Sequence, residues 1–239
     1  MKIEKVTTLT IVLALAMLVF NFAYAEPTGV DIAFNSTEMP GVTPASSLTT
    51  AGGSFTTLVL NGTYQNPRWK AYVGNVSGVL TLSDSAGSSI YNWGLAAVSG
   101  QVYVSRNDTV DWSTAGCAPL QAIEDEEAFL NKDSSSVDSI VNTFNHTIHR
   151  SFFIGTTEIS SNTCRSLVTN VNDASQTPSE TANFQEVLIS DGVGNVVYTT
   201  LLEDSVVGFD GSLFDFQMIV PEMVGSPTPT TYYFYAEIN

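Results

Sequence analysis

The sequence has few charged residues and very few cationic ones. Only 13% of its 239 residues are charged, about half the share of an ordinary soluble domain. Eight Lys and Arg residues stand against 24 Asp and Glu residues, so the formal net charge is −16. A chain so poor in cations cannot bind a phosphate backbone by releasing counterions, which excludes nucleic acid as a partner. Its 44% apolar content excludes a disordered acidic chain.

A long apolar run lies at the N-terminus. Lys2 and Lys5 precede the apolar stretch 6–20, and Ala23-Tyr24-Ala25 has small residues where a signal peptidase accepts them. The sequence therefore predicts a signal peptide over residues 1–25 and export of the chain. Its removal takes away Lys2, Lys5 and Glu4 and leaves 214 residues with a net charge near −17. The alternative is an uncleaved anchor, because residues 6–25 are just long enough to span a bilayer.

Cysteine is scarce as well. The chain has two cysteines, Cys117 and Cys164, separated by 47 positions. An even pair in an exported chain indicates one disulfide. The alternative is two buried thiols with no bond between them.

The chain contains five Asn-x-Ser/Thr sequons. In an exported protein these tripeptides are candidate glycosylation sites, and any that carry a glycan must lie on the surface. The five asparagines are Asn35, Asn61, Asn75, Asn107 and Asn145.

Short alternating apolar runs predict a mainly β fold, an antiparallel β-sandwich with a small helical insert at about 118–145. Residues 26–54 are rich in Pro, Ser and Thr and predict an extended arm. Residues 55–239 then form a single domain. The expected strands are 55–60, 69–74, 76–83, 90–95, 101–106, 152–159, 186–190, 195–202, 214–220 and 231–238.

Three local patterns give finer expectations. In 101–106, Val102 and Val104 should face the core while Gln101, Tyr103 and Ser105 face solvent. Segments 82–91 and 189–198 share the pattern apolar-Ser-Asp-x-x-Gly-x-x-β-branched-Tyr. This pattern predicts two hairpins whose turns are capped by an Asp side chain. It fits either an internal duplication or the small choice of good turns.

Few residues indicate chemistry. His146 and His149 are spaced to bind one metal ion on a helix, but no third ligand stands at a fixed spacing, so ordinary surface or loop histidines are favoured. The acidic residues at 124–127 predict a solvated helix face, and Asp204, Asp210 and Asp215 match no calcium-loop spacing. No nucleophile elbow or phosphate-binding loop is present. We therefore expect no metal, no cofactor and no enzymatic activity.

Aromatic residues offer a binding alternative. A platform for sugar rings could be formed by Trp69, Trp93 and Trp112 together with the aromatic run 232–235. Packing of these rings within and between strands is the simpler interpretation. The C-terminal aromatic segment follows a Pro-rich spacer. It can complete the sandwich of its own chain. Alternatively, this segment or the N-terminal arm can pair with a neighbouring subunit.

The sequence resembles an uncharacterised family of secreted archaeal surface proteins. The resemblance covers most of the chain from Gly52 to Ile238. It rests on the aromatic strand 68–73 followed by Gly-Asn-Val-Ser-Gly at 74–78, and on Tyr91-Asn92-Trp93. It implies an exported archaeal surface protein and makes N-glycosylation plausible, but it implies no activity.

Together these features predict a non-enzymatic extracellular or cell-surface protein with a structural or interaction role. Its expected partners are other copies of itself, joined by strand exchange into a filament or lattice, or surface glycans. The alternative function is an extracellular carbohydrate-binding module. A more distant alternative is a hydrolase with a pair of acidic residues contributed by distant strands.

Overall fold

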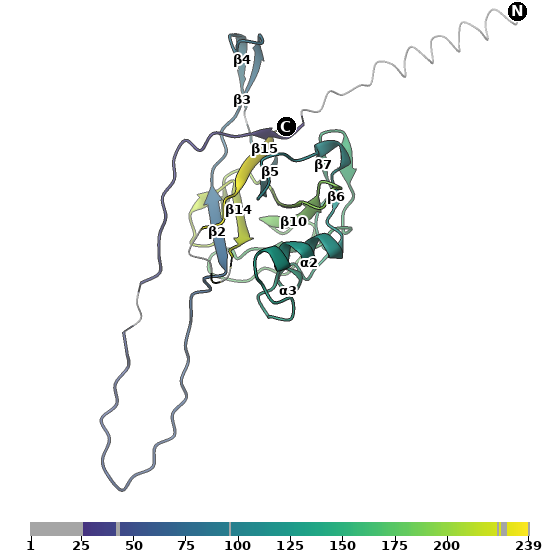
Figure 1. Cartoon of the computed structure of the whole chain (residues 1–239). Coiled ribbons are helices and arrows are strands. Elements are labelled where there is room, and N and C mark those ends of the chain that lie inside the picture. The colour runs from purple at the N-terminus through teal and green to yellow at the C-terminus, as the bar shows by residue number, and fades with distance from the viewer. Residues whose placement is uncertain (1–25, 42–43, 96, 224, 226–228, 239) are drawn as a thin grey trace, which may run out of the picture.

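The computed structural model describes residues 26–41, 44–95, 97–223, 225 and 229–238. The expected signal peptide lies outside these residues. The fold is mainly β, with antiparallel strand pairs arranged in layers and a small helical insert, as the sequence predicted (Figure 1).

Seven strands form the main sheet. Its order is β1-β15-β5-β11-β10-β6, and β9 pairs with β10 along the same edge as β6. The strands are β1 (Thr28–Gly29), β5 (Gly100–Ser105), β6 (Gly116–Cys117), β9 (Ser166–Val168), β10 (Gln185–Ser190), β11 (Val196–Leu201) and β15 (Tyr233–Ile238). β15 pairs with β5 from Tyr233 opposite Ser105 to Ile238 opposite Gly100. The C-terminal strand thus belongs to the sheet of its own chain.

A second layer covers one face of the main sheet. It consists of β2 (Trp69–Gly74), β14 (Phe216–Pro221), α2 (Leu120–Phe129) and α3 (Ile140–Thr143). β2 and β14 pair antiparallel along their whole length. Leu188 and Tyr198 of the main sheet lie in one buried cluster with Ile123 of α2 and Met218 of β14. Apolar burial between these layers holds the helical insert against the strands.

The opposite face of the main sheet is covered as well. The hairpin of β7 (Phe152–Ile154) and β8 (Thr157–Ile159) packs there, with Trp112 of a 3-10 turn, η1 (Trp112–Thr114). The expectation that Gln101, Tyr103 and Ser105 face solvent is therefore wrong: all three are buried. The alternation of side chains showed correctly that these residues share a face. It could not show that the β7–β8 hairpin packs over that face.

Other expected elements also differ from the structure. Residues 55–60 form no strand, and the chain from 31 to 66 has no helix or strand in its described part. The expected strands 76–83 and 90–95 are the hairpin of β3 (Val79–Ser83) and β4 (Ser89–Gly94). The segment 214–220 is divided between β13 (Leu213–Phe214), which pairs with β12 (Val206–Val207), and β14.

Candidate functional site

The β3–β4 hairpin is amphipathic. Leu80 lies opposite Trp93 and Leu82 opposite Tyr91, so these four side chains share one face, which we call the apolar face. Thr81 lies opposite Asn92 on the other face. The rings of Tyr91 and Trp93 meet edge to face, with centroids 4.8 Å apart.

The hairpin turn follows the expected pattern. The backbone N–H groups of Ala86 and Ser88 each donate to Asp84 Oδ1 at 2.9 Å, and Gly87 takes φ +84°. In the matching hairpin, Val193 and Asn195 donate their N–H groups to Asp191 Oδ1. Both predicted Asp-capped turns are therefore confirmed.

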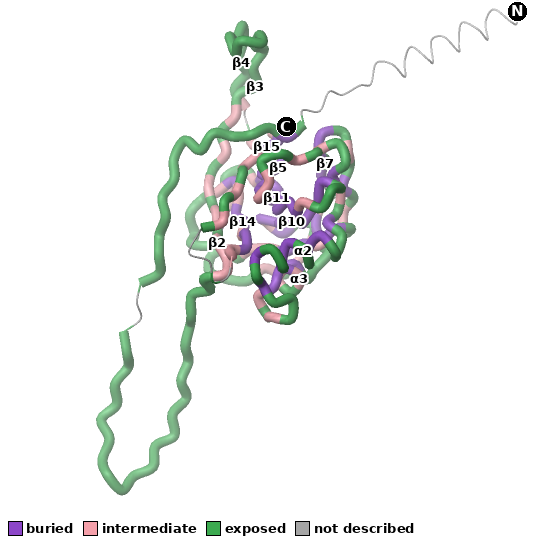
Figure 2. The backbone as a smooth tube through the Cα atoms, in the orientation of Figure 1, coloured by how far each residue is buried: buried purple, intermediate pink, exposed green. Residues whose placement is uncertain are grey.

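The apolar face has no cover in the described chain. Leu80, Leu82, Tyr91 and Trp93 are all among the exposed large hydrophobic side chains, and the hairpin projects from the body of the molecule (Figure 2). Asp84 at the turn is its only charged residue. This exposed apolar face makes the hairpin a candidate interaction surface.

The base of the hairpin meets the end of the main sheet. A Cβ placed on Gly78 would lie 2.7 Å from Cδ1 of Ile238, so any larger residue here would require the Ile238 side chain to move. β1 covers the outer edge of β15 next to this point, with Thr28 opposite Ala236 and Gly29 opposite Tyr235. Only two residue pairs form this ladder.

The chain between β1 and β2 is exposed over the described part of residues 31–66. This stretch overlaps the extended segment expected at 26–54, and we call it the arm from here on. It carries large apolar side chains in solvent; Phe55, Val59, Leu60 and Tyr64 are each more than 80% exposed. In Figure 1 the arm leaves the body beside β15 and runs past the opposite end of the molecule before it returns to β2. The segment Phe55–Leu60, which we call the arm segment, is rich in β-formers and lacks charge and proline.

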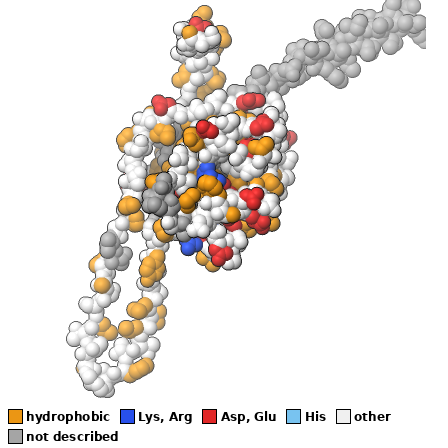
Figure 3. All heavy atoms as spheres, viewed as in Figure 1, with side chains coloured by type: hydrophobic (Ala, Val, Ile, Leu, Met, Phe, Trp, Pro, Cys, Tyr) orange, Lys and Arg blue, Asp and Glu red, His pale blue; other side chains and the backbone are white. Residues whose placement is uncertain are grey.

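Charge is distributed unevenly between these parts. Residues 39–105, which include most of the arm and the whole hairpin, contain one acidic residue, Asp84, and two basic ones, Arg68 and Lys70. The remaining 23 acidic residues lie elsewhere, 19 of them after Arg106. Figure 3 shows red acidic side chains over the body and orange apolar ones along the arm. The arm and hairpin are thus nearly neutral attachments to an acidic body.

The structure does not bring the three tryptophans together. Trp69 on β2 packs near Phe144, and its indole N–H donates to the Asp138 carbonyl at 2.9 Å. Trp112 lies on the opposite side of the main sheet against Tyr103 and Tyr235. Trp93 is on the projecting hairpin. Two of the three therefore serve packing in separate clusters.

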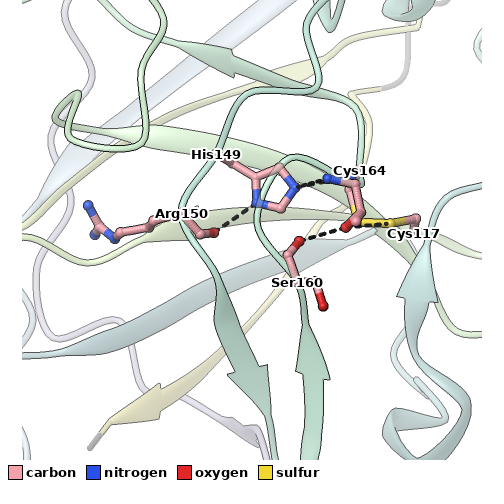
Figure 4. Close-up of a disulfide and its surroundings, with 6 residues drawn as sticks. Cys117, His149, Arg150, Ser160 and Cys164 are labelled. Carbon is pink, nitrogen blue, oxygen red and sulfur yellow. Dashed lines mark hydrogen bonds between the residues drawn. A yellow bond between two sulfur atoms is a disulfide. The ribbon is translucent and has the colours of Figure 1, made fainter.

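Cys117 and Cys164 form the predicted disulfide, which links β6 to the chain before β9. His149 lies beside it (Figure 4). Its Nε2 accepts the N–H groups of Cys164 at 3.0 Å and Thr163 at 3.2 Å, and its Nδ1 lies 2.8 Å from the Arg150 carbonyl. These contacts require a neutral ring with the proton on Nδ1. Burial lowers the pKa of His149 further.

His149 lies in a loop, as the sequence interpretation allowed, but it is fully buried there and does not face solvent. His146 is exposed, and its backbone pairs with Ser166. No described group of three or more His, Cys, Asp or Glu residues is placed to hold a metal ion. The spacing of the two histidines could not show that backbone N–H groups donate to Nε2 of His149.

The acidic segment of α2 is not a solvated face throughout. Glu126 and Glu127 are buried, whereas Glu124 is exposed. Arg106 donates to both carboxylate oxygens of Glu126 and stacks on Phe129, with its guanidinium carbon 3.7 Å from the ring centroid. Glu127 Oε1 accepts the N–H of Val141 at 3.0 Å. The two carboxylates join α2 to the main sheet and to α3.

The later acidic residues also have structural contacts. Asp215 is buried, and its carboxylate accepts the N–H groups of Val76 at 2.8 Å and Ser205 at 3.0 Å. Asp210 accepts the Ser212 N–H at 2.9 Å in a turn. Both carboxylates therefore hold loops next to the second layer.

Glu186 is a buried acid that the sequence did not single out. It projects from β10 toward β14, where its Oε2 accepts the N–H of Ile219 at 2.9 Å. Its Oε1 and the Tyr198 hydroxyl are buried without a hydrogen-bond partner among the described residues. Burial raises the pKa of Glu186 well above its ordinary value. The raised pKa favours the neutral form of this carboxyl group in the buried contact between the two layers.

The five sequons lie outside the core. Asn35, Asn61, Asn75 and Asn145 are exposed, and Asn107 is half-buried. Asn75 Oδ1 accepts the N–H of Asp215 at 3.2 Å, and Asn107 Oδ1 accepts the N–H of Thr109 at 3.1 Å.

Comparison with protein-family models, curated proteins and solved structures finds no match to this chain. Among the described residues, no helix has the length and apolar character needed to cross a membrane.

Proposed function

We propose that this protein is a non-enzymatic structural protein of the cell surface or extracellular space that associates with itself by strand exchange. The observation that carries the proposal is the combination of an exposed arm, with an uncharged segment at Phe55–Leu60, and an uncovered amphipathic hairpin on one acidic body. The hairpin and the segment Phe55–Leu60 of the arm are rich in β-forming residues, and both expose apolar side chains to solvent. Exposed apolar strands of this type are templates for pairing with another chain.

We also propose that the chain is exported with removal of residues 1–25 and that its sequons carry glycans. The sequence pattern 23–25 supports cleavage, and the positions of Asn35, Asn61, Asn75 and Asn145 on the surface support modification. Intact mass of the protein recovered from its native cells tests both. A mass that includes residues 1–25 would contradict the cleavage, and a mass equal to the bare chain would contradict the glycans.

Self-association is tested on the mature protein, residues 26–239, by sedimentation velocity and negative-stain microscopy over a range of concentrations. We expect ordered polymers whose amount rises with protein concentration. We also expect salt to promote assembly, because it screens the repulsion between acidic bodies. A protein that stays monomeric at all concentrations and salt levels would overturn the proposal. Titration with a glycan array in parallel tests the carbohydrate-binding alternative.

A further inference from the structure

The β3–β4 hairpin lacks the support that a stable sheet needs. β3 pairs with β4 only, and the described chain supplies no third strand to this two-stranded sheet. An isolated two-stranded hairpin is marginal in water, whereas a third strand or a packed face stabilises it. Leu80, Leu82, Tyr91 and Trp93 give the hairpin an apolar face ready for such a contact.

The arm segment resembles a strand in composition but has no strand to pair with in the described structure. Phe55–Leu60 alternates between two rows of side chains, Phe55, Thr57 and Val59 in one and Thr56, Leu58 and Leu60 in the other. Its six residues are all exposed, and in the described structure none of them belongs to a strand. A short segment with high β-propensity, no charge and no proline is the type that adds to an open sheet edge.

The two elements lie at opposite ends of the molecule. The hairpin projects beyond β15 at one end, whereas the far part of the arm extends past the other end, beyond α3 (Figure 1). A contact between them in two different copies joins unlike surfaces. Contacts of this heterologous kind leave one free donor and one free acceptor at the ends of every oligomer, so the chain of subunits can grow.

The charge distribution favours a second copy as the occupant. The acidic bodies repel one another, but the arm segment has no charge and the hairpin has only Asp84 at its tip. These two elements can therefore meet without a charge penalty. A basic partner would instead be drawn to the body, away from both of them.

We propose that the arm segment Phe55–Leu60 of one copy adds as a third strand to the β3–β4 hairpin of a second copy. One apolar row of the arm segment then extends the apolar face that Leu80, Leu82, Tyr91 and Trp93 form. β1 stays paired with β15 of its own chain. This inference rests on the proposed self-association and names the donor and the acceptor.

The donor is tested with the double variant Leu58→Pro/Val59→Pro. Successive residues of a strand point their N–H groups to opposite edges, so two adjacent prolines remove a donor from the pairing edge in either register. The matched control is Thr49→Pro/Thr50→Pro, which changes two exposed, uncharged residues of the same arm outside the segment. We expect the concentration needed for polymer formation to rise at least tenfold in the first variant and to stay unchanged in the control.

The acceptor is tested with Leu80→Thr/Leu82→Thr, which keeps β-forming residues but removes apolar surface from the apolar face. Its control is Val79→Thr, on the opposite face. All four variants alter exposed positions, and unchanged thermal unfolding would confirm that the body remains folded. We expect the acceptor variant, but not its control, to fail to polymerise.

Mixing the two defective variants identifies the pairing. The proline variant keeps an intact hairpin and the threonine variant keeps an intact arm segment, so the mixture should form one-to-one dimers that do not grow. Polymers from the proline variant that form as in the wild type would overturn this inference and leave self-association intact. A mixture without dimers would also overturn it. If polymers instead grew by packing of one hairpin on another, the two variants would not restore each other's missing contact. A wild-type protein that never associates would overturn the proposed function itself.

Discussion

His149 and Cys164 are joined through a hydrogen bond in which the Cys164 backbone N–H donates to the buried imidazole Nε2 at 3.0 Å. The same nitrogen accepts the Thr163 N–H, so one neutral ring holds the backbone of both Cys164 and the residue before it. A proton on Nε2 would turn this acceptor into a donor facing two other donors. The contact therefore couples the local fold to the protonation state of His149.

The first prediction concerns pH. The folded pKa of His149 is lowered by burial, so the unfolded chain takes up a proton near pH 6.5 while the folded chain does not. The free energy of unfolding should be independent of this group above about pH 6.5 and should fall as pH drops from there toward the folded pKa. Urea unfolding between pH 7.5 and 5.5 measures the slope.

His149→Gln provides the comparison for this slope. Glutamine does not titrate, so this part of the pH dependence should vanish, while the loss of the ring contacts costs about 1–3 kcal/mol at pH 7.5. The exposed His146→Gln is the matched control and should keep the wild-type slope. An unchanged slope in His149→Gln would show that other groups cause the dependence.

The second prediction concerns Glu186, whose pKa is raised by complete burial. A raised folded pKa gives stability that is present below the unfolded value near 4.5 and is lost as pH rises toward the folded pKa. Glu186→Gln keeps an acceptor for the Ile219 N–H and cannot ionise. Relative to the wild type, the variant should gain at least ~1 kcal/mol of unfolding free energy between pH 5 and pH 8, since one pKa unit corresponds to about 1.4 kcal/mol.

The control for Glu186 is Glu158→Gln, because Glu158 lies on β8 with its side chain exposed. Its difference from the wild type should stay within about 0.5 kcal/mol across this pH range. If Glu186→Gln behaves like the control, the carboxyl group does not titrate with a raised pKa in the fold.

The third prediction concerns the ion pair of Arg106 and Glu126. Arg106→Gln leaves a buried carboxylate without its cation and should lower the free energy of unfolding by about 2–3 kcal/mol. The exposed Glu124→Gln on the same helix should have little effect. The double variant Arg106→Met/Glu126→Leu should recover most of the loss, because it removes both buried charges together. A double variant as unstable as Arg106→Gln would contradict this explanation.

The fourth prediction concerns the disulfide. Replacing both Cys117 and Cys164 by serine frees a loop of 47 residues. The chain-entropy estimate for such a loop is about 4 kcal/mol at 25 °C, and we expect a loss of that order in urea unfolding. Reduction of the wild type by dithiothreitol should lower its melting temperature in the same direction. A loss below about 1 kcal/mol would show that the loop is already restricted in the unfolded chain.

Several features could be predicted from the sequence because their causes are local. The pattern at 82–91, with Asp84 and Gly87 in the turn, predicted the hairpin and its cap. The cysteine count gave the disulfide. Period-two patterns and turn residues act over a few positions, so they can be identified without tertiary contacts.

What covers each face was decided by the tertiary structure. Tyr103 was expected to face solvent, yet it is buried because the β7–β8 hairpin packs over its face. Glu186 is buried because β14 packs over the other face of the main sheet. His149 becomes an acceptor for backbone N–H groups only when the segments at 149 and 163–164 meet.

The arm gives the opposite case. Phe55–Leu60 has the composition of a strand but forms none, because a strand needs a partner edge and this segment lies paired with none in the described chain. The sequence by itself determined which segments can become strands, where they turn and where the charge lies. The tertiary structure decided which of them have partners and covers, since pairing and burial depend on distant parts of the chain.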